Sequence, residues 1–532
     1  MKILLIGINS KYIHPAVGIH QIVANSKFPV TFLEFSIKDN NENILAAMGK
    51  ENFQVIGFSV YIWNIGKIKD IIKSYSRETI FILGGPEASY RPELLLFDRR
   101  VRFIIKNEGE EAYNELIEYL NNERDIKEVS NLYYLSQNKI TYTFNRMPDL
   151  SKIRHDLGLI KDFKNRVFYL EASRGCPFYC SYCLSSLEKT VRFFNLEKVK
   201  EEIVFALDKK VRVLKFLDRT FNLRQTNMRK LLSFIRDHDN HLTTFQFEIV
   251  ADLLEEETIE LLQTIRRGQI RFEIGVQSTN EIVTKAVRRK QDFQKLKENV
   301  LRIKNNIIIH LDLIAGLPYE DRQSFIRTFN ETFELFGDEI QLGFLKELQG
   351  TEISIHKDLH GYKFSLLPPY EVQSNSYLSK ADLDEIKIVN SAVNKYYNSG
   401  DYPKTMEYLF QKLHLNPYFT FLKIGNFIGV SNLLKMQIDE ISKALYKALK
   451  DEVSAELLYI IKQDYLLKPI KPKIWWERNI SREERKNVYQ EFLKTFPKLN
   501  SEILYRYSHL EKYENEYLLI TYKPSALFIL RV

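Results

Sequence analysis

The sequence predicts an α/β protein: a doubly wound, Rossmann-like amino-terminal domain, a partial (β/α)6 barrel and a mainly helical carboxyl-terminal domain. The 532 residues are enough for about three domains. Up to residue 350, short apolar runs rich in Val and Ile alternate with helical stretches, a pattern typical of parallel sheets covered on both faces. From Ala381 onward, Leu, Lys and Tyr recur at helical spacing instead.

The first domain is expected over residues 1–135. Its strands are predicted at Lys2–Ile8, Val30–Phe35, Val55–Val60, Ile80–Leu83 and Val101–Ile105. Small residues end or follow two of these strands: Ser59, Gly84 and Gly85. Because ligands of doubly wound sheets bind at the carboxyl ends of the strands, we expect these three residues to line a binding crevice.

A connector is expected over residues 136–165, and a hairpin over residues 131–144 leads into it. The barrel is expected over residues 166–368 and the helical domain over residues 369–532. The barrel strands are predicted at Phe168–Ala172, Val213–Leu217, Phe245–Val250, Arg271–Val276, Ile308–Ile314 and Ile340–Lys346. Ser481 to Glu484 fits a helix capping box, and Tyr517–Tyr522 with Leu527–Val532 fits a hairpin.

Composition and charge exclude several classes of protein. The chain is 45% hydrophobic with 20 Gly and 15 Pro, unlike collagen or a disordered protein. The net charge of +8 is small for this length, so it permits a nucleic-acid partner without requiring one. No uncharged apolar run approaches 18 residues, so we expect no membrane span and a cytoplasmic protein.

The chain has only three cysteines, Cys176, Cys180 and Cys183, and they follow the first predicted barrel strand. Three thiolates on one loop suit a soft metal centre better than a disulfide framework. A 4Fe–4S cluster usually takes four cysteines, so three would leave one iron open to a small ligand. The spacing alone also allows a zinc loop completed by a histidine, or reduced core thiols.

The C-x3-C-x2-C spacing, with Tyr182 before the last cysteine, resembles that of the radical S-adenosylmethionine (SAM) enzymes. The resemblance implies that the three cysteines hold a 4Fe–4S cluster whose open iron chelates the amino and carboxylate groups of SAM. An electron from the cluster would then cleave SAM to a 5′-deoxyadenosyl radical. It also implies an external low-potential electron donor such as ferredoxin or flavodoxin.

Later barrel motifs resemble the same family. Glu248 lies in a third-strand F-Q-F-E segment, Gln277 in a fourth-strand G-V-Q-S, and Asp312 in a fifth-strand D-L-I-x-G-L-P. The resemblance implies that Glu248 and Gln277 contact the SAM ribose and that Arg289 approaches its carboxylate. Taken singly, such residues could equally cap a strand end or satisfy loop backbone. Arg219 departs from the second-strand F-x-D-D-x-F pattern, because it replaces the second acid.

A doubly wound domain before this barrel resembles the cobalamin-binding radical SAM subgroup. Gly84-Gly85 and the N-E-G-E segment ending at Glu110 fit that subgroup's loops, and glycines there would let a corrin approach the backbone. The D-x-H-x-x-G motif of many cobalamin proteins is missing, so His14 is not assigned as a cobalt ligand. Alternatively, the domain holds no cobalamin and serves as a platform for a substrate or partner.

The expected function is therefore cobalamin-dependent radical SAM catalysis, with methyl transfer to an unactivated carbon of an unknown substrate. Radical SAM tRNA modification is a second possibility, supported by the net positive charge and by a basic, Trp-containing stretch at residues 468–476. The alternative explanation of this stretch is a solvated basic turn. Against it, residues 1–135 lack the cysteines of the methylthiotransferase branch. A non-catalytic metal- or cobalamin-binding module is the third. The last domain resembles one of unknown function appended in one branch of the subgroup.

Overall fold

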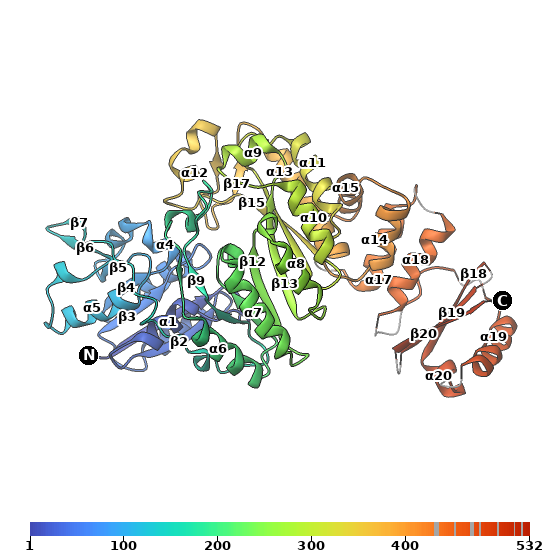
Figure 1. Cartoon of the computed structure of the whole chain (residues 1–532), viewed down its shortest axis with the longest axis horizontal. Coiled ribbons are helices and arrows are strands. Elements are labelled where there is room, and N and C mark those ends of the chain that lie inside the picture. Colours follow the sequence, from blue (N-terminus) through green and yellow to red (C-terminus); the bar gives the residue numbers. More distant parts are fainter. Residues whose placement is uncertain are drawn as a thin grey trace. The chain divides into compact units, whose positions relative to one another are not determined.

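The computed structural model describes residues 1–429, 436–451, 454–468, 473–477, 480–496, 499–514, 516–522 and 525–531 (Figure 1). The chain forms two compact units. The first unit comprises residues 1–325 and 343–380, and the second comprises residues 326–342 and 381–532. Residues 469–472 of the basic stretch predicted above lie outside the described residues.

A seven-stranded sheet of order β2-β1-β3-β4-β5-β6-β7 opens the first unit. Its parallel strands are β1 (Ile3–Asn9), β2 (Thr31–Ser36), β3 (Val55–Ser59), β4 (Ile80–Gly84) and β5 (Val101–Ile105). These positions confirm the sequence prediction. The hairpin of β6 (Leu132–Ser136) and β7 (Lys139–Tyr142) adds to β5 in antiparallel orientation. The boundary expected at residue 135 therefore passes through a hairpin that belongs to the sheet.

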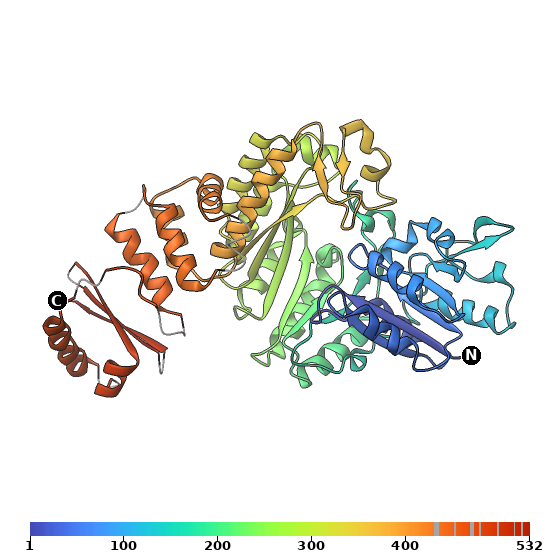
Figure 2. The ribbon, with the colours of Figure 1, turned by 180° about the vertical axis from the view of Figure 1, so that it is seen from behind.

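Helices cover both faces of this sheet (Figure 2). They are α1 (Val17–Asn25), α2 (Asn41–Met48), α3 (Ile65–Ser74), α4 (Pro86–Ser89) and α5 (Glu110–Leu120). Ile44 of α2 and Ile71 of α3 belong to the apolar core on one face, whereas Ile19 of α1 and Leu116 of α5 belong to the core on the other. Burial on both faces explains why the strands read as continuous apolar runs.

The second sheet of the chain has six strands in the order β15-β14-β13-β12-β11-β8, so it is an open, partial barrel. The strands are β8 (Phe168–Leu170), β11 (Val213–Phe216), β12 (Thr244–Ile249), β13 (Ile270–Gln277), β14 (Ile308–Ala315) and β15 (Glu339–Phe344). All six match predicted strands. Burial alternates along β13, where Phe272 and Ile274 are buried and Glu273 and Gln277 are half-buried. This alternation places the polar set of β13 on one face, opposite the apolar set.

The connecting helices of the barrel are α6 (Leu196–Asp208), α7 (Gln225–Asp237), α8 (Glu256–Gln263), α9 (Glu281–Ala286), α10 (Phe293–Ile303), α11 (Arg322–Phe333) and α12 (Glu352–Ile355). Two short strand pairs flank it, β9 (Ser173–Arg174) with β10 (Arg192–Phe193) and β16 (Lys363–Phe364) with β17 (Val372–Ser374).

The second unit is largely helical. Its helices are α13 (Lys380–Ala392), α14 (Pro403–Glu407), α15 (Pro417–Ile428), α17 (Ile438–Ala448), α18 (Ala455–Leu466), α19 (Arg482–Thr495) and α20 (Ser501–Arg506). The predicted capping box of Ser481 and Glu484 is present at the start of α19. A three-stranded antiparallel sheet joins β18 (Ser508–Tyr513), β19 (Glu516–Tyr522) and β20 (Ser525–Arg531). The sequence prediction found its last two strands and missed β18.

None of the helices in the described ranges combines the length and the apolar character that crossing a bilayer requires.

Candidate functional site

The three cysteines lie on the loop that follows β9, at the carboxyl end of β8. Cys176 and Cys180 are buried and Cys183 is half-buried, and none forms a disulfide. The loop starts at Gly175, whose φ of +90° and close approach to the Thr190 carbonyl oxygen leave no room for a Cβ. Buried Asp218, at the end of β11, anchors the preceding residues because it accepts hydrogen bonds from the Ser173 hydroxyl (2.5 Å) and the Ala172 N–H (2.9 Å).

Two arginines flank this loop. Although burial alone would lower the pKa of Arg289, the neighbouring phenol of Tyr182 and thiol of Cys180 raise it. For Arg219, whose side chain is 52% exposed, partial desolvation lowers the pKa, but Glu248 and Cys183 raise it overall. Cations beside thiolates stabilise the ionised form that binds metals. Among the described residues, no three His, Cys, Asp or Glu side chains are grouped closely enough to hold a metal ion.

The SAM residues expected from the barrel motifs fall into two groups around the cysteines. Gln277 and Arg289 pack at Gly275, where Arg289 donates to the carbonyl oxygen and an added Cβ would lie 2.3 Å from Gln277 Nε2. Gln277 Oε1 is buried without a hydrogen-bond partner, as expected for an acceptor that awaits a ligand hydroxyl. The sheet register places Gly275 beside Asp312, whose Oδ1 lies 3.0 Å from His310 Nε2.

Glu248 forms the other group with Arg219. An Nη atom of Arg219 lies 3.8 Å from Glu248 Oε2, and Lys215 Nζ lies 4.0 Å from Glu248 Oε1. Burial raises the pKa of the Glu248 carboxyl, and the two cations partly oppose that effect. The structure thus brings Glu248, Gln277 and Arg289 to the same end of the barrel as the cysteines. This donor set suits the ribose hydroxyls and charged termini of SAM.

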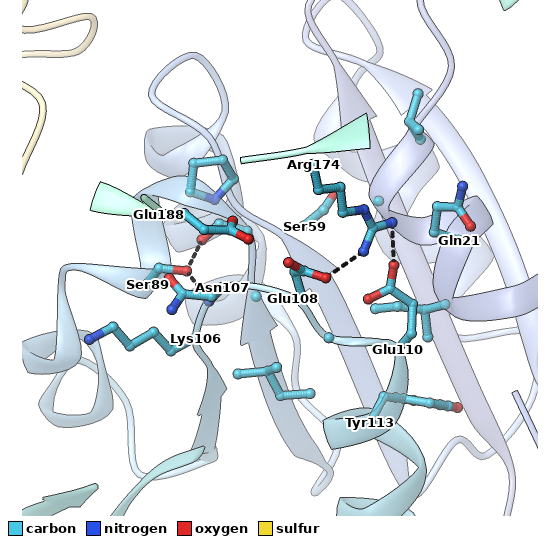
Figure 3. Close-up of a pocket in the computed structure, with 18 of the residues that line it drawn as sticks. Gln21, Ser59, Ser89, Lys106, Asn107, Glu108, Glu110, Tyr113, Arg174 and Glu188 are labelled. Atoms are coloured by element: carbon cyan, nitrogen blue, oxygen red, sulfur yellow. Dashed lines mark hydrogen bonds and ion pairs between the residues drawn. The ribbon is translucent and has the colours of Figure 1, made fainter. Parts of the chain in front are cut away.

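A cavity of about 700 Å³ lies in the first unit, between the strand ends of the first sheet and the cysteine loop (Figure 3). Ser59, Gly84 and Gly85 line it, as predicted from the sequence, and Leu217 and Arg219 line its barrel side. Gly85 has φ +96°, and a Cβ there would lie 2.8 Å from the Val60 carbonyl oxygen. The glycine-rich wall and the size of this cavity fit a large, flat ligand such as a corrin.

His14 is absent from the described residues that line the cavity. Its Nδ1 lies 2.7 Å from the Tyr169 hydroxyl instead.

A buried charge network in the cavity wall ties the first sheet to the cysteine loop. Arg174 lies two residues before Cys176, and its guanidinium donates to Glu108 (2.7 Å) and Glu110 (2.7 Å) (Figure 3). It also donates to Glu171 (2.8 Å). Burial of Glu171 would raise its pKa, but Arg174 and His155 together lower it to about 2. The sequence alone did not predict the roles of Arg174 and Glu171, although it places an arginine two residues before the first cysteine and acids after the fifth strand.

Three family models match separate parts of the chain. Residues 3–117 match the B12 binding domain, residues 170–332 match the Radical SAM superfamily, and residues 358–520 match a protein of unknown function, DUF4080. The radical SAM cysteine motif implies a 4Fe–4S cluster and SAM, and the B12 binding domain implies cobalamin.

Curated relatives share modest identity with this chain. The "Uncharacterized methyltransferase PH0819" of Pyrococcus horikoshii is 27% identical over 30% of this chain and 37% of its own length. The "Cobalamin-dependent radical SAM methyltransferase TokK" of Streptomyces tokunonensis is 24% identical over 59% of this chain and 47% of its own length. An "Anaerobic magnesium-protoporphyrin IX monomethyl ester cyclase" of Synechocystis is 23% identical over 44% of this chain and 48% of its own length. The chain spans about half or less of the length of these relatives.

Two solved structures share the fold. One is a cobalamin-dependent SAM radical enzyme, OxsB, with aqua-cobalamin and SAM bound (TM-score 0.61, 14% identity, 94% of this chain and 82% of that chain). The other is the radical SAM methyltransferase TsrM from Kitasatospora setae with cobalamin and a [4Fe-4S] cluster bound (TM-score 0.59, 16% identity, 71% of this chain and 82% of that chain).

Proposed function

We propose that this chain, in which a B12-binding domain precedes a radical SAM domain and a domain of unknown function, is a cobalamin-dependent radical SAM enzyme that methylates an unactivated carbon. The observation that carries the proposal is a cavity that is lined both by Gly85 of the first sheet and by Arg219 beside the cysteine loop. A corrinoid received at Gly85 would share this cavity with Arg219, which lies 3.8 Å from Glu248, one of the residues expected to contact SAM. Methyl transfer requires the two cofactors to lie close together.

In this proposal, residues at different positions of the site bind different cofactors. Cys176, Cys180 and Cys183 hold the cluster, and Ser59, Gly84 and Gly85 receive the corrinoid. When bound, the cluster supplies the electron that cleaves SAM, and the corrinoid supplies the methyl group.

The SAM contacts follow from the chemistry of the side chains. The unpartnered Gln277 Oε1 accepts from a ribose hydroxyl, and Glu248 accepts from a second hydroxyl. Arg289, held at Gly275, donates to the SAM carboxylate. Methyl transfer as the outcome is supported by the two relatives whose names describe methyltransferases.

The test is purification without oxygen, reconstitution with iron, sulfide and a corrinoid, and reduction by dithionite in the presence of SAM. We expect about four irons per chain, corrin absorption and release of 5′-deoxyadenosine. Cys180→Ala removes one of the three thiolate ligands, so 5′-deoxyadenosine should fall to the background of protein-free assays. Zinc in place of iron, or undiminished SAM cleavage by Cys180→Ala, would disprove the proposal.

A further inference from the structure

Arg219 and Tyr61 both line the cavity between the first sheet and the cysteine loop. We propose that the substrate carries a carboxylate, and that the Arg219 guanidinium and the Tyr61 hydroxyl bind this group in the cavity. The inference rests on the proposed function, because it assumes that the corrinoid and SAM are bound beside the substrate. It extends that function by naming the chemical class of the substrate.

The two residues come from the two sheets that enclose the cavity. Tyr61 follows the end of β3 by two residues, and Arg219 follows the end of β11 by three. The hydroxyl oxygen of Thr220, the residue after Arg219, lies 3.8 Å from the Cys176 sulfur. A group held by Arg219 would therefore lie close to the cysteines and in the same cavity as the corrinoid. The substrate has to bind there, because it reacts with groups delivered by both cofactors.

The charges of the cavity wall are balanced, and most of them are paired. Among the described residues, four acids and four cations line the cavity: Glu108, Glu110, Glu171, Glu188, Lys106, Arg146, Arg174 and Arg219. Each of the four acids accepts a hydrogen bond from Arg174 or Arg192. Arg146 donates to Glu115. Lys106 lies against three tyrosine rings, and its side chain points away from Arg174 (Figure 3).

Arg219 differs from the other cations of the wall. Its guanidinium forms no hydrogen bond within the part of the chain that the structure describes. Its ion-pair partner is Glu248, but the 3.8 Å between Nη and Oε2 is too long for a hydrogen bond. The planar fork of N–H groups is therefore available to a ligand, and its geometry matches that of a carboxylate. A doubly charged phosphate would be repelled more strongly by Glu248.

The Tyr61 hydroxyl supplies a second donor. Its ring stacks on Trp63, with centres 4.3 Å apart and planes at 10°, and Trp63 Nε1 donates to the Ile8 carbonyl oxygen (3.3 Å). These contacts hold the ring in place. Burial raises the pKa of the Tyr61 phenol, and the nearby charge of Arg219 partly opposes that effect. The phenol therefore keeps its proton at neutral pH and can donate it to a carboxylate oxygen.

The experiment compares a carboxylate with its uncharged amide. The full-length chain, reconstituted with the cluster and cobalamin and saturated with SAM, is titrated without oxygen or reductant. The probes are 3-phenylpropionate, 3-phenylpropionamide and phenyl phosphate, and calorimetry gives their affinities. The test variants are Arg219→Gln and Tyr61→Phe, which removes only the hydroxyl. The matched control is Arg302→Gln, since Arg302 is 41% exposed and pairs with Glu256 away from the cavity.

We expect the wild type to bind 3-phenylpropionate about tenfold more tightly than the amide, because the amide forms no charge-assisted hydrogen bond with Arg219. Arg219→Gln should abolish this preference, and Tyr61→Phe should reduce it about threefold. Arg302→Gln should keep the wild-type preference. The affinities of the same proteins for cobalamin and SAM show whether each variant is folded.

Equal affinities of the wild type for the carboxylate and the amide would overturn the inference, as would a preference that survives in Arg219→Gln. Tighter binding of phenyl phosphate than of 3-phenylpropionate would also overturn it, because the site would then suit a dianion. If Arg219→Gln weakens SAM binding and leaves the preference intact, Arg219 serves SAM and the inference is wrong. A reconstituted chain that takes up neither iron nor corrinoid would instead refute the proposed function, and the inference with it.

Discussion

At the scale of single residues, Arg174 links the two halves of the site. Its guanidinium contacts Glu108 and Glu110 after β5 and also Glu171 after β8, so one side chain fixes the cysteine loop against the cavity wall of the first sheet. The side chains are at most 16% exposed, so loss of one partner would leave buried charge uncompensated. Such losses are strongly destabilising.

The low pKa of Glu171 predicts a pH-dependent contribution to stability. The pKa falls from an ordinary 4.5 to about 2, so the ionised carboxylate stabilises the fold above pH 4.5, on the order of 3 kcal/mol. This contribution is lost as the pH falls from 4.5 towards 2, where the folded state also binds the proton. Thermal unfolding of Glu171→Gln should therefore show a deficit against wild type at pH 7 that narrows below pH 4.5.

The matched control for Glu171→Gln is Glu51→Gln, since Glu51 is half exposed and pairs with exposed Lys2. Surface pairs of this kind contribute little, so its unfolding should follow wild type at every pH. A Glu171→Gln deficit that stays constant down to pH 2 would contradict the assigned pKa.

The sequence predicted where single residues lie in the site when a recognisable motif contained them. Ser59, Gly84 and Gly85 line the cavity, and Gln277 and Arg289 meet at Gly275. The partners of Arg174 could not be predicted, because Glu108 lies 66 residues away and only the fold brings it within hydrogen-bond distance. No local pattern distinguishes a buried ion pair from two solvated charges.

At the scale of elements, the turn from β4 to α4 shapes the cavity wall. Gly85 adopts φ +96° and ψ 173°, a conformation that is essentially restricted to glycine. Its backbone also approaches Val60 so closely that a Cβ would lie 2.8 Å from the carbonyl oxygen. The turn therefore depends on this residue for both its conformation and its packing.

We expect Gly85→Ala to lower the free energy of unfolding by about 1–3 kcal/mol and to weaken corrinoid binding, because the turn must move. Equilibrium urea unfolding and titration with cobalamin followed by absorption check both effects. Gly66→Ala is the control, since Gly66 lies in α3 with open space around its added Cβ. It should leave cobalamin binding intact and be neutral or stabilising by up to about 1 kcal/mol. If Gly85→Ala unfolds in urea and binds cobalamin as the wild type does, the turn does not require glycine at this position.

The strands of both parallel sheets were predictable because burial makes them apolar, and β5 coincides with its predicted range, Val101–Ile105. Their pairing was less predictable. The sequence predicts the hairpin of residues 131–144 but not its partner, because only the fold shows that β6 hydrogen-bonds to β5. β18 was missed because its sequence, SHLEKY, carries charges on a half-buried strand. Strand partners and polar strands depend on tertiary context, which a single sequence does not show.

At the scale of the whole molecule, the second unit is discontinuous in sequence. It includes residues 326–342, which contain most of α11, as well as the chain from residue 381. Phe333 of α11 packs against Phe421 and Phe410, with ring centres 5.7 and 4.7 Å apart. Phe329 packs in the same way against Phe421 and Tyr418. The last third of the chain therefore completes the burial of a helix that belongs, by sequence, to the barrel.

A chain cut after residue 380 should expose Phe329 and Phe333, which are 0% and 1% exposed in the full chain. Each exposed Phe costs about 1.5–3 kcal/mol. We expect the truncated protein to bind an apolar fluorescent dye and to self-associate in size-exclusion chromatography, unlike the full chain. The truncated Phe329→Gln/Phe333→Gln variant should bind less dye. A monomeric truncated chain that binds no dye would show that α11 does not need the second unit.

Because the second unit is discontinuous in sequence, its parts are synthesised on the ribosome at different times. Translation delivers α11 well before Phe410 and Phe421, so the helix leaves the exit tunnel without the surface that will shield it. At about 5–20 residues per second, that interval lasts several seconds. During this time Phe329 and Phe333 of the nascent chain are exposed, so we expect chaperones that act during synthesis to bind it.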